Sequence, residues 1–197
     1  MMLRAVLAAL PVVCAHLAGA GSPALAAQHP PRSLYTTVDL KKCKSVQRHK
    51  DGDAWLCKGL PGYPLYVAEG DMRYFMSAGP QPDKRRAATQ TLGPFNHPFE
   101  GKSKRITVEW RFYEKIDGRK VPYATIVRFF TSNNSAKGEV LVVNRITDRD
   151  TCQLVVVDAL ANSDAIVIAR AAADERARNA DCKGDPIADG ASGKSPM

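Results

Sequence analysis

Apolar and polar side chains alternate strictly along the stretch Arg105-Ile106-Thr107-Val108-Glu109-Trp110-Arg111-Phe112-Tyr113. A period of two is typical of a β-strand, because successive side chains point to opposite faces of the sheet. The apolar face carries Ile106, Val108, Trp110 and Phe112, and the polar face carries Thr107, Glu109, Arg111 and Tyr113. This strand therefore predicts a sheet with one face buried in a core.

Further runs rich in Val, Ile, Tyr and Phe follow the same pattern and are separated by Gly, Asp, Asn and Pro, as antiparallel strands are. With the first stretch, the expected strands span residues 34–40, 54–58, 64–68, 72–78, 105–113, 122–131, 138–147 and 152–158. A short helix is expected at residues 83–89, and an irregular loop at residues 92–103.

One longer helix is expected near the C-terminal end. Residues 165–179 are rich in alanine and follow the N-cap candidates Asn162, Ser163 and Asp164. Strands followed by a helix predict an α+β domain, here a curved antiparallel sheet of about 7–8 strands with one C-terminal helix packed on it. The domain is expected at residues 33–182, with disordered segments at 27–32 and 183–197, which are polar and rich in Pro, Gly or Ser.

The N-terminal residues have the order of a secretory signal peptide. Arg4 precedes an apolar run from Ala5 to Ala20, and a small-residue site ends at Ala26 or Ala27. We predict a signal peptide at residues 1–26 and a periplasmic or secreted protein. The run is short of the roughly 20 apolar residues that span a bilayer, so no transmembrane anchor is expected. A lipoprotein signal that lipidates Cys14 is the alternative.

Export changes the meaning of the cysteines. Cys14 leaves with the signal, and the other four of the five cysteines stay in the exported chain. Four cysteines in an oxidising compartment predict two disulfides, with three pairings open. We favour Cys43 with Cys57 and Cys152 with Cys182, because each pair closes a local loop. A zinc site is the alternative, although no Cys-x2-Cys pair is present; no metal or other cofactor is expected.

The charge of the chain favours anionic partners. The formal net charge of +8 falls to +7 when Arg4 is removed with the signal. A basic domain attracts lipid headgroups, acidic polysaccharide, nucleic acid or acidic proteins. No nucleic-acid recognition module is visible, so no nucleic-acid partner is expected. Lys and Arg residues scattered over a solvated surface give the same charge without any partner.

Four charged residues are the candidate ligand-binding set: Glu109, Arg111, Arg128 and Asp158. They lie in neighbouring expected strands, together with Arg145, and would form a polar groove able to hold an anionic or sugar ligand. The alternative is a solvated sheet face with cross-strand ion pairs, each of which contributes less than about 1 kcal/mol.

A second candidate region runs from Trp55 to Phe75, where aromatic residues flank a Gly and Pro loop. Such residues make either a recognition surface or a core, with Trp55 packed over the disulfide of Cys57. Catalytic residues are not predicted. His97 is the one histidine inside the loop region, and it has no adjacent cysteine and no nucleophile elbow.

Several segments resemble a group of small exported alphaproteobacterial proteins of uncharacterised function. These segments are residues 55–73, Gln90 to Asn96, Glu109-Trp110-Arg111 and Asp158 to Asn162. The resemblance spans most of the exported domain. It implies a periplasmic location and supports the two cysteine pairs, and it brings no activity or site residue.

Together these features predict a non-enzymatic binding or interaction module of the envelope that prefers an anionic partner, such as an acidic envelope component or protein. One alternative is a hydrolase-like enzyme that acts on envelope material, with His97, Glu109, Asp158 and Arg111 or Arg128 in one cleft. The other alternative is a structural envelope protein.

Overall fold

The structure is a computed structural model, and it describes residues 31–49 and 52–197. The predicted signal peptide and residues 27–30 lie outside the described residues. Most of the described chain forms β-strands, with one α-helix near the C-terminal end and two disulfides. The α+β class is therefore confirmed.

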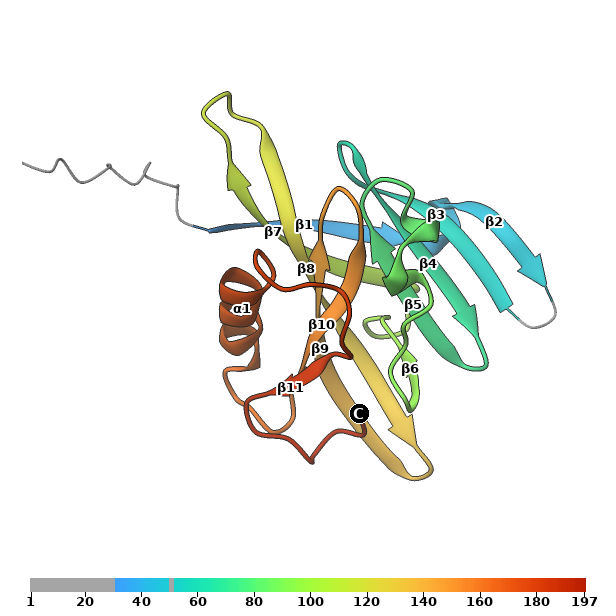
Figure 1. Cartoon of the computed structure of the whole chain (residues 1–197). Helices are drawn as coiled ribbons and strands as arrows, with labels where there is room; N and C mark the ends of the chain where they lie inside the picture. Colours follow the sequence, from blue (N-terminus) through green and yellow to red (C-terminus); the bar gives the residue numbers. More distant parts are fainter. Residues whose placement is uncertain (1–30, 50–51) are drawn as a thin grey trace, which may run out of the picture.

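The larger sheet has seven strands in the order β1-β7-β8-β9-β10-β11, with β6 paired to β8 (Figure 1). All neighbours are antiparallel except β11, which runs parallel to β10. The strands are β1 (Arg32–Asp39), β6 (Phe95–His97), β7 (Arg105–Glu114), β8 (Lys120–Asn133), β9 (Ala136–Ile146), β10 (Thr151–Asp158) and β11 (Ile187–Asp189).

A second, antiparallel sheet has four strands in the order β2-β3-β4-β5. They are β2 (Lys44–His49), β3 (Gly52–Leu60), β4 (Tyr63–Gly70) and β5 (Arg73–Ala78). The sequence pattern predicted these residues as part of one curved sheet. They form a separate layer, because two sheets that each have an apolar face bury both faces by packing together.

The four-stranded sheet packs on one face of the larger sheet, which we call the sheet-covered face. Three of the four apolar side chains predicted for β7, Ile106, Val108 and Trp110, pack in this interface, and Trp110 is fully buried there. Trp110 donates a hydrogen bond from its indole N–H to the Thr36 hydroxyl of β1, at 2.8 Å. Its ring also packs against Gly59 of β3, where a Cβ atom would lie 2.9 Å from the ring. The largest side chain of the core is therefore fixed by both sheets.

Helix α1 (Ala165–Arg176) covers the opposite face, which we call the helix-covered face (Figure 1). The sequence predicted this helix three residues longer at its C-terminal end. Alanines of α1 are buried against Val143, Val155 and Val157 of the sheet. Small side chains let the helix backbone approach the strands closely. Asp164 is at the N-cap position, and its side chain makes no capping hydrogen bond.

Both predicted disulfides are confirmed. Cys43 pairs with Cys57 across 14 residues, and Cys152 pairs with Cys182 across 30 residues. The first bond links the turn after β1 to β3, and the second links the segment after α1 to β10. Each face of the larger sheet thus has one disulfide near the element that covers it.

The segment 183–197 corrects a prediction, because the sequence favoured a disordered tail there. Ile187–Asp189 adds β11 to the edge of the sheet, and Ser195 is buried. The cause is the Asp158 carboxylate, which accepts hydrogen bonds from the N–H groups of Lys194 and Ser195 and from the Ser195 hydroxyl. A buried carboxylate that needs hydrogen-bond donors therefore holds a tail with few apolar residues.

The remaining helical segments are single 3-10 turns. They are η1 (Leu40–Lys42), η2 (Pro82–Lys84) and η3 (Arg86–Ala88), and the last two occupy the region predicted as a short helix. Within the part of the chain that the structure describes, no helix has the length and apolar character needed to cross a bilayer.

Candidate functional site

Glu109 and Arg111 point to the helix-covered face, as their alternation with Trp110 predicts. Both are nearly inaccessible, at 4% and 7% exposure. The Glu109 carboxylate accepts hydrogen bonds from Arg170 of α1, at 2.7 and 3.2 Å, and from the Ser33 hydroxyl of β1, at 2.5 Å. The carboxylate is therefore closed off by partners from two elements.

The Arg111 guanidinium is likewise enclosed by hydrogen-bond partners. Its guanidinium binds the Asp174 carboxylate of α1 through two hydrogen bonds, at 2.9 and 2.6 Å, and the Tyr123 hydroxyl donates to the same carboxylate at 2.5 Å. Burial lowers the pKa of Arg111, but the hydrogen bond and charge of Asp174 outweigh it and raise the pKa above its ordinary value. This cluster of Glu109, Arg111, Tyr123, Arg170 and Asp174 is the ionic cluster. It joins α1 to the sheet.

Arg128 and Asp158 are placed elsewhere. Arg128 lies on the helix-covered face of β8, where it forms an ion pair with Glu139 of β9. Asp158 follows Val157, which faces α1, so alternation directs the Asp158 side chain to the other face. Burial acts to raise the pKa of Asp158, but hydrogen bonds from Ser195, Lys194 and Ala161 lower it to about 2.

The predicted polar groove is therefore wrong as a single site. The structure brings Glu109 and Arg111 together, pairs Arg128 with Glu139 and uses Asp158 to hold the tail. The physical reason is that α1 packs on this face, and its Arg170 and Asp174 side chains fill the space that a ligand would need. His97 stacks on Phe99 and Phe130 at β6, and partial burial lowers the pKa of its imidazole.

A group of cations surrounds the disulfide of Cys43 and Cys57. A pocket of about 360 Å³ at this place is lined by Lys42, Lys58 and Arg105, with Asp39 as its carboxylate. Six exposed cations in and next to this pocket form the basic surface: Lys41, Lys42, Lys44, Lys58, Lys104 and Arg105. None of the six makes an ion pair with a carboxylate of residues 31–49 or 52–197.

The arginines on the helix-covered face behave differently, since Arg111, Arg128 and Arg170 all have carboxylate partners. The six cations of the basic surface lie at one end of the larger sheet, where β1 ends and β7 begins. Cations that are close together and unpaired repel one another, and an anion that binds between them removes this repulsion.

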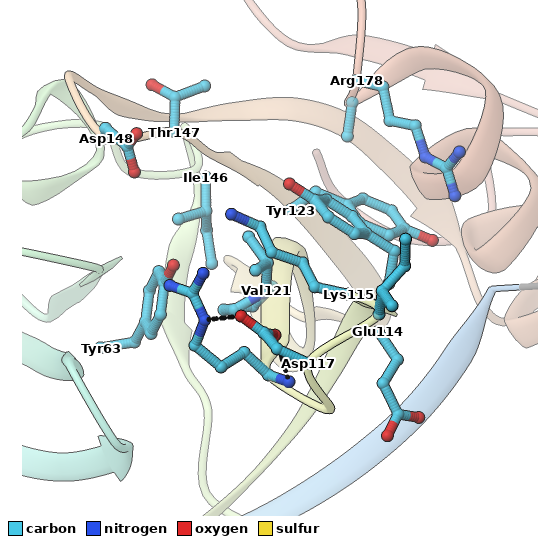
Figure 2. Close-up of a pocket in the computed structure, with 15 residues that line it drawn as sticks. Tyr63, Glu114, Lys115, Asp117, Val121, Tyr123, Ile146, Thr147, Asp148 and Arg178 are labelled. Carbon is cyan, nitrogen blue, oxygen red and sulfur yellow. Dashed lines mark hydrogen bonds and ion pairs between the residues drawn. The ribbon is translucent and has the colours of Figure 1, made fainter. Parts of the chain in front are cut away.

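A larger cavity, of about 1130 Å³, lies at the opposite end of β7. We call it the tyrosine cleft, because Tyr63, Tyr113 and Tyr123 line it together with the β7–β8 hairpin, the β9–β10 turn and the end of α1 (Figure 2). In this view Tyr63 and Asp148 lie on one side of the cleft, and Tyr123 and Glu114 lie on the other. The cleft thus joins both sheets and the helix.

The tyrosines of the cleft are held in different ways. Tyr113 and Tyr123 are nearly parallel, with ring centroids 6.4 Å apart, and Arg178 lies over the Tyr123 ring at 4.7 Å. Burial, the charge of Asp148 and the nearby Tyr113 raise the pKa of Tyr63. Its phenol is therefore neutral near pH 7 and is able to donate and accept a hydrogen bond.

Comparisons with known proteins give no further assignment: no family model, no curated protein and no solved structure matches the chain. Among residues 31–49 and 52–197, no group of three or more His, Cys, Asp or Glu side chains is placed to hold a metal ion.

The sequence alone did not predict most residues of the basic surface, of the tyrosine cleft or of the ionic cluster. Arg170 and Asp174 are four residues apart and so share one side of the helix, which was the available signal for the ionic cluster. The lysines near Cys43 are visible as a short charged run. The tyrosine cleft had no such signal, because Tyr63, Tyr113 and Asp148 are far apart in the sequence.

Proposed function

We propose that this protein is a non-enzymatic binding module of an oxidising, extracytoplasmic compartment, and that it holds an anionic partner on the basic surface. The observation that carries the proposal is the pocket lined by Lys42, Lys58 and Arg105, whose cations have no carboxylate partner among the described residues. A cation that has no ion-pair partner is available to a ligand.

Two observations support the compartment. The two disulfides persist where thiols are oxidised. The N-terminal residues have the order of a signal peptide. On this basis the partner is an acidic component of the envelope or an acidic protein in the same compartment.

The charge at the basic surface acts at two stages of binding. Six cations at one end of the domain speed the encounter with an anionic surface, and the pocket then accepts one or more anionic groups. The lysine side chains are exposed, so dissolved salt screens them within a Debye length of about 8 Å at physiological ionic strength. Binding should therefore weaken clearly as the salt concentration rises.

The test is a charge-removal variant of the purified protein. In the variant Lys42→Gln, Lys58→Gln and Arg105→Gln, we expect binding to dextran sulfate and to vesicles that contain phosphatidylglycerol to weaken about 100-fold at low salt, at about 1 kcal/mol per charge. Titration calorimetry on dextran sulfate and vesicle sedimentation provide the two measurements, and they separate a polyanion from a lipid surface as the source of the anionic group.

The matched control removes the same number of charges elsewhere. Lys84, Lys137 and Lys194 are exposed and lie outside the basic surface. The variant with Gln at these three positions should bind as the unchanged protein does. Equal weakening by both variants, or binding that does not respond to salt, would contradict a partner held at the basic surface.

A further inference from the structure

We propose that the tyrosine cleft is a second binding site, and that its ligand is an uncharged oligosaccharide. This inference does not depend on the basic surface, which lies at the other end of β7. It depends on the polar groups that line the cleft and on the shape and charge of the walls.

Four polar groups of the cleft have no hydrogen-bond or ion-pair partner for their side chains among the described residues. They are the hydroxyls of Tyr63 and Tyr113, the ammonium of Lys115 and the carboxylate of Asp148. Figure 2 shows Tyr63 and Asp148 across the cleft from Lys115. Together they provide hydroxyl, cationic and anionic groups from three different elements, and a sugar has hydroxyls that donate and accept at most of its carbons.

The charge of the walls excludes a simple polyanion. Three cations and three carboxylates line the cleft: Lys115, Arg119 and Arg178, and Glu114, Asp117 and Asp148. Asp117 and Arg119 neutralise each other at 2.6 Å, and Glu114 is paired with Arg32 at 2.9 Å. An uncharged ligand thus enters without strong attraction or repulsion, and the partly exposed rings of Tyr63 and Tyr113 give its apolar ring faces a surface to pack on.

The size of the cleft indicates more than one sugar ring. Its volume of about 1130 Å³ is slightly above the range of about 300–1,000 Å³ that is typical of ligand sites. Tyr63 belongs to the smaller sheet, and Tyr113 and Tyr123 belong to the larger one. A chain of a few pyranose rings would therefore contact both sheets at once.

The experiment measures binding of uncharged tetrasaccharides of glucose, of galactose and of N-acetylglucosamine to the purified protein by titration calorimetry. We expect at least one to bind with an affinity that does not depend on salt. Asp148→Asn should weaken this binding about tenfold, and Tyr63→Phe about fivefold, because each loses a hydrogen bond to the sugar.

The matched controls are Asp83→Asn and Tyr66→Phe. Tyr66 lies on β4, as Tyr63 does, and neither control residue lines the cleft. Both controls should bind the sugar normally, and all four variants should keep their thermal midpoint and their binding to dextran sulfate. This last measurement separates a failure at the cleft from a failure at the basic surface.

Two results would overturn the proposal. The first is that none of the three tetrasaccharides binds. The second is that a tetra-alanine peptide binds in their place and responds to Asp148→Asn, which would assign the cleft to a peptide.

Discussion

The two faces of the larger sheet are buried by opposite means. On the sheet-covered face the core is made of large apolar side chains, among them Trp110, Leu65 and Ile106, all fully buried. On the helix-covered face the alanines of α1 pack on valines, Ile126 and Leu141 of the sheet, and beside them the ionic cluster joins α1 to the strands. The same strand, β7, supplies Trp110 to one face and Glu109 and Arg111 to the other.

This difference shows that a covered sheet face can bury paired charges beside its apolar contacts. Large side chains fill volume on the sheet-covered face, and their burial is non-directional. On the helix-covered face the two arginines must each meet a carboxylate in the right geometry, because an unpaired buried charge is costly. We therefore expect the first face to depend on side-chain volume and the second on matched partners, and the following predictions test that comparison.

The largest effect should come from removing volume on the sheet-covered face. Trp110→Ala loses a fully buried ring and the hydrogen bond to Thr36, and it should lower the free energy of unfolding by about 4 kcal/mol in urea denaturation. Val167→Ala is the control, because Val167 is 59% exposed on α1; it should change stability by less than about 0.5 kcal/mol. A small effect of Trp110→Ala would mean that this core is not specified by volume.

The two disulfides sharpen the comparison, because each lies near one covering layer. Replacing Cys152 and Cys182 by Ala opens a loop of 30 residues and should cost about 3.5 kcal/mol, while replacing Cys43 and Cys57 opens one of 14 residues and should cost about 3 kcal/mol. Urea denaturation of the two double variants measures the difference between their free energies of unfolding. The reverse order would show that loop length does not decide their contributions.

Removing one partner of an ion pair in the ionic cluster should lower the free energy of unfolding strongly. Replacing both partners by apolar side chains should lower it less. Arg111→Met leaves Asp174 without its guanidinium, and we expect a loss of about 3 kcal/mol. The double variant Arg111→Met with Asp174→Leu removes both charges and should be more stable than Arg111→Met alone. Additive losses would argue against coupling between these two side chains.

The matched control for the ionic cluster is Arg119→Met in the exposed pair with Asp117. The two side chains are 69% and 51% exposed. An exposed ion pair contributes little, so the loss should stay below about 1 kcal/mol.

The smallest effect concerns the segment 183–197, which belongs to neither covering layer. Because the pKa of Asp158 is lowered from 3.8 to about 2, its carboxylate stabilises the fold above about pH 4, and this contribution is lost as the pH falls through 2. Between about pH 5 and pH 2 the unchanged protein should lose about 2 kcal/mol more than Asp158→Asn. Urea denaturation of both proteins at these two pH values measures the difference. Equal losses of stability in the unchanged protein and in Asp158→Asn would contradict the role of the carboxylate.

Local pattern predicted most of the strands. All eight expected strands are present, because alternation and turn residues act over a few neighbouring positions. The three that were missed are β2, β6 and β11. β6 and β11 are three residues long and have no pattern of their own, and β2 is a charged edge strand.

Prediction of the candidate sites was weaker for a physical reason. The sequence placed Glu109 and Arg111 on the polar face of β7 and could not show what covers that face. Tyr63, Tyr113 and Asp148 meet only because the hairpin, the β9–β10 turn and the smaller sheet converge. Sites assembled from distant segments leave no local signal.

The sequence by itself determined the α+β class and which face of β7 is apolar, and it favoured the disulfide pairing that the structure shows, since these follow from local periodicity and short loops. Only the tertiary structure decided that the strands divide into two sheets, that α1 closes the ionic cluster and that the chain end from Lys183 is held by Asp158. These features depend on contacts between residues that are far apart in the sequence. In such contacts a buried polar group pairs with whichever distant group completes its hydrogen bonds.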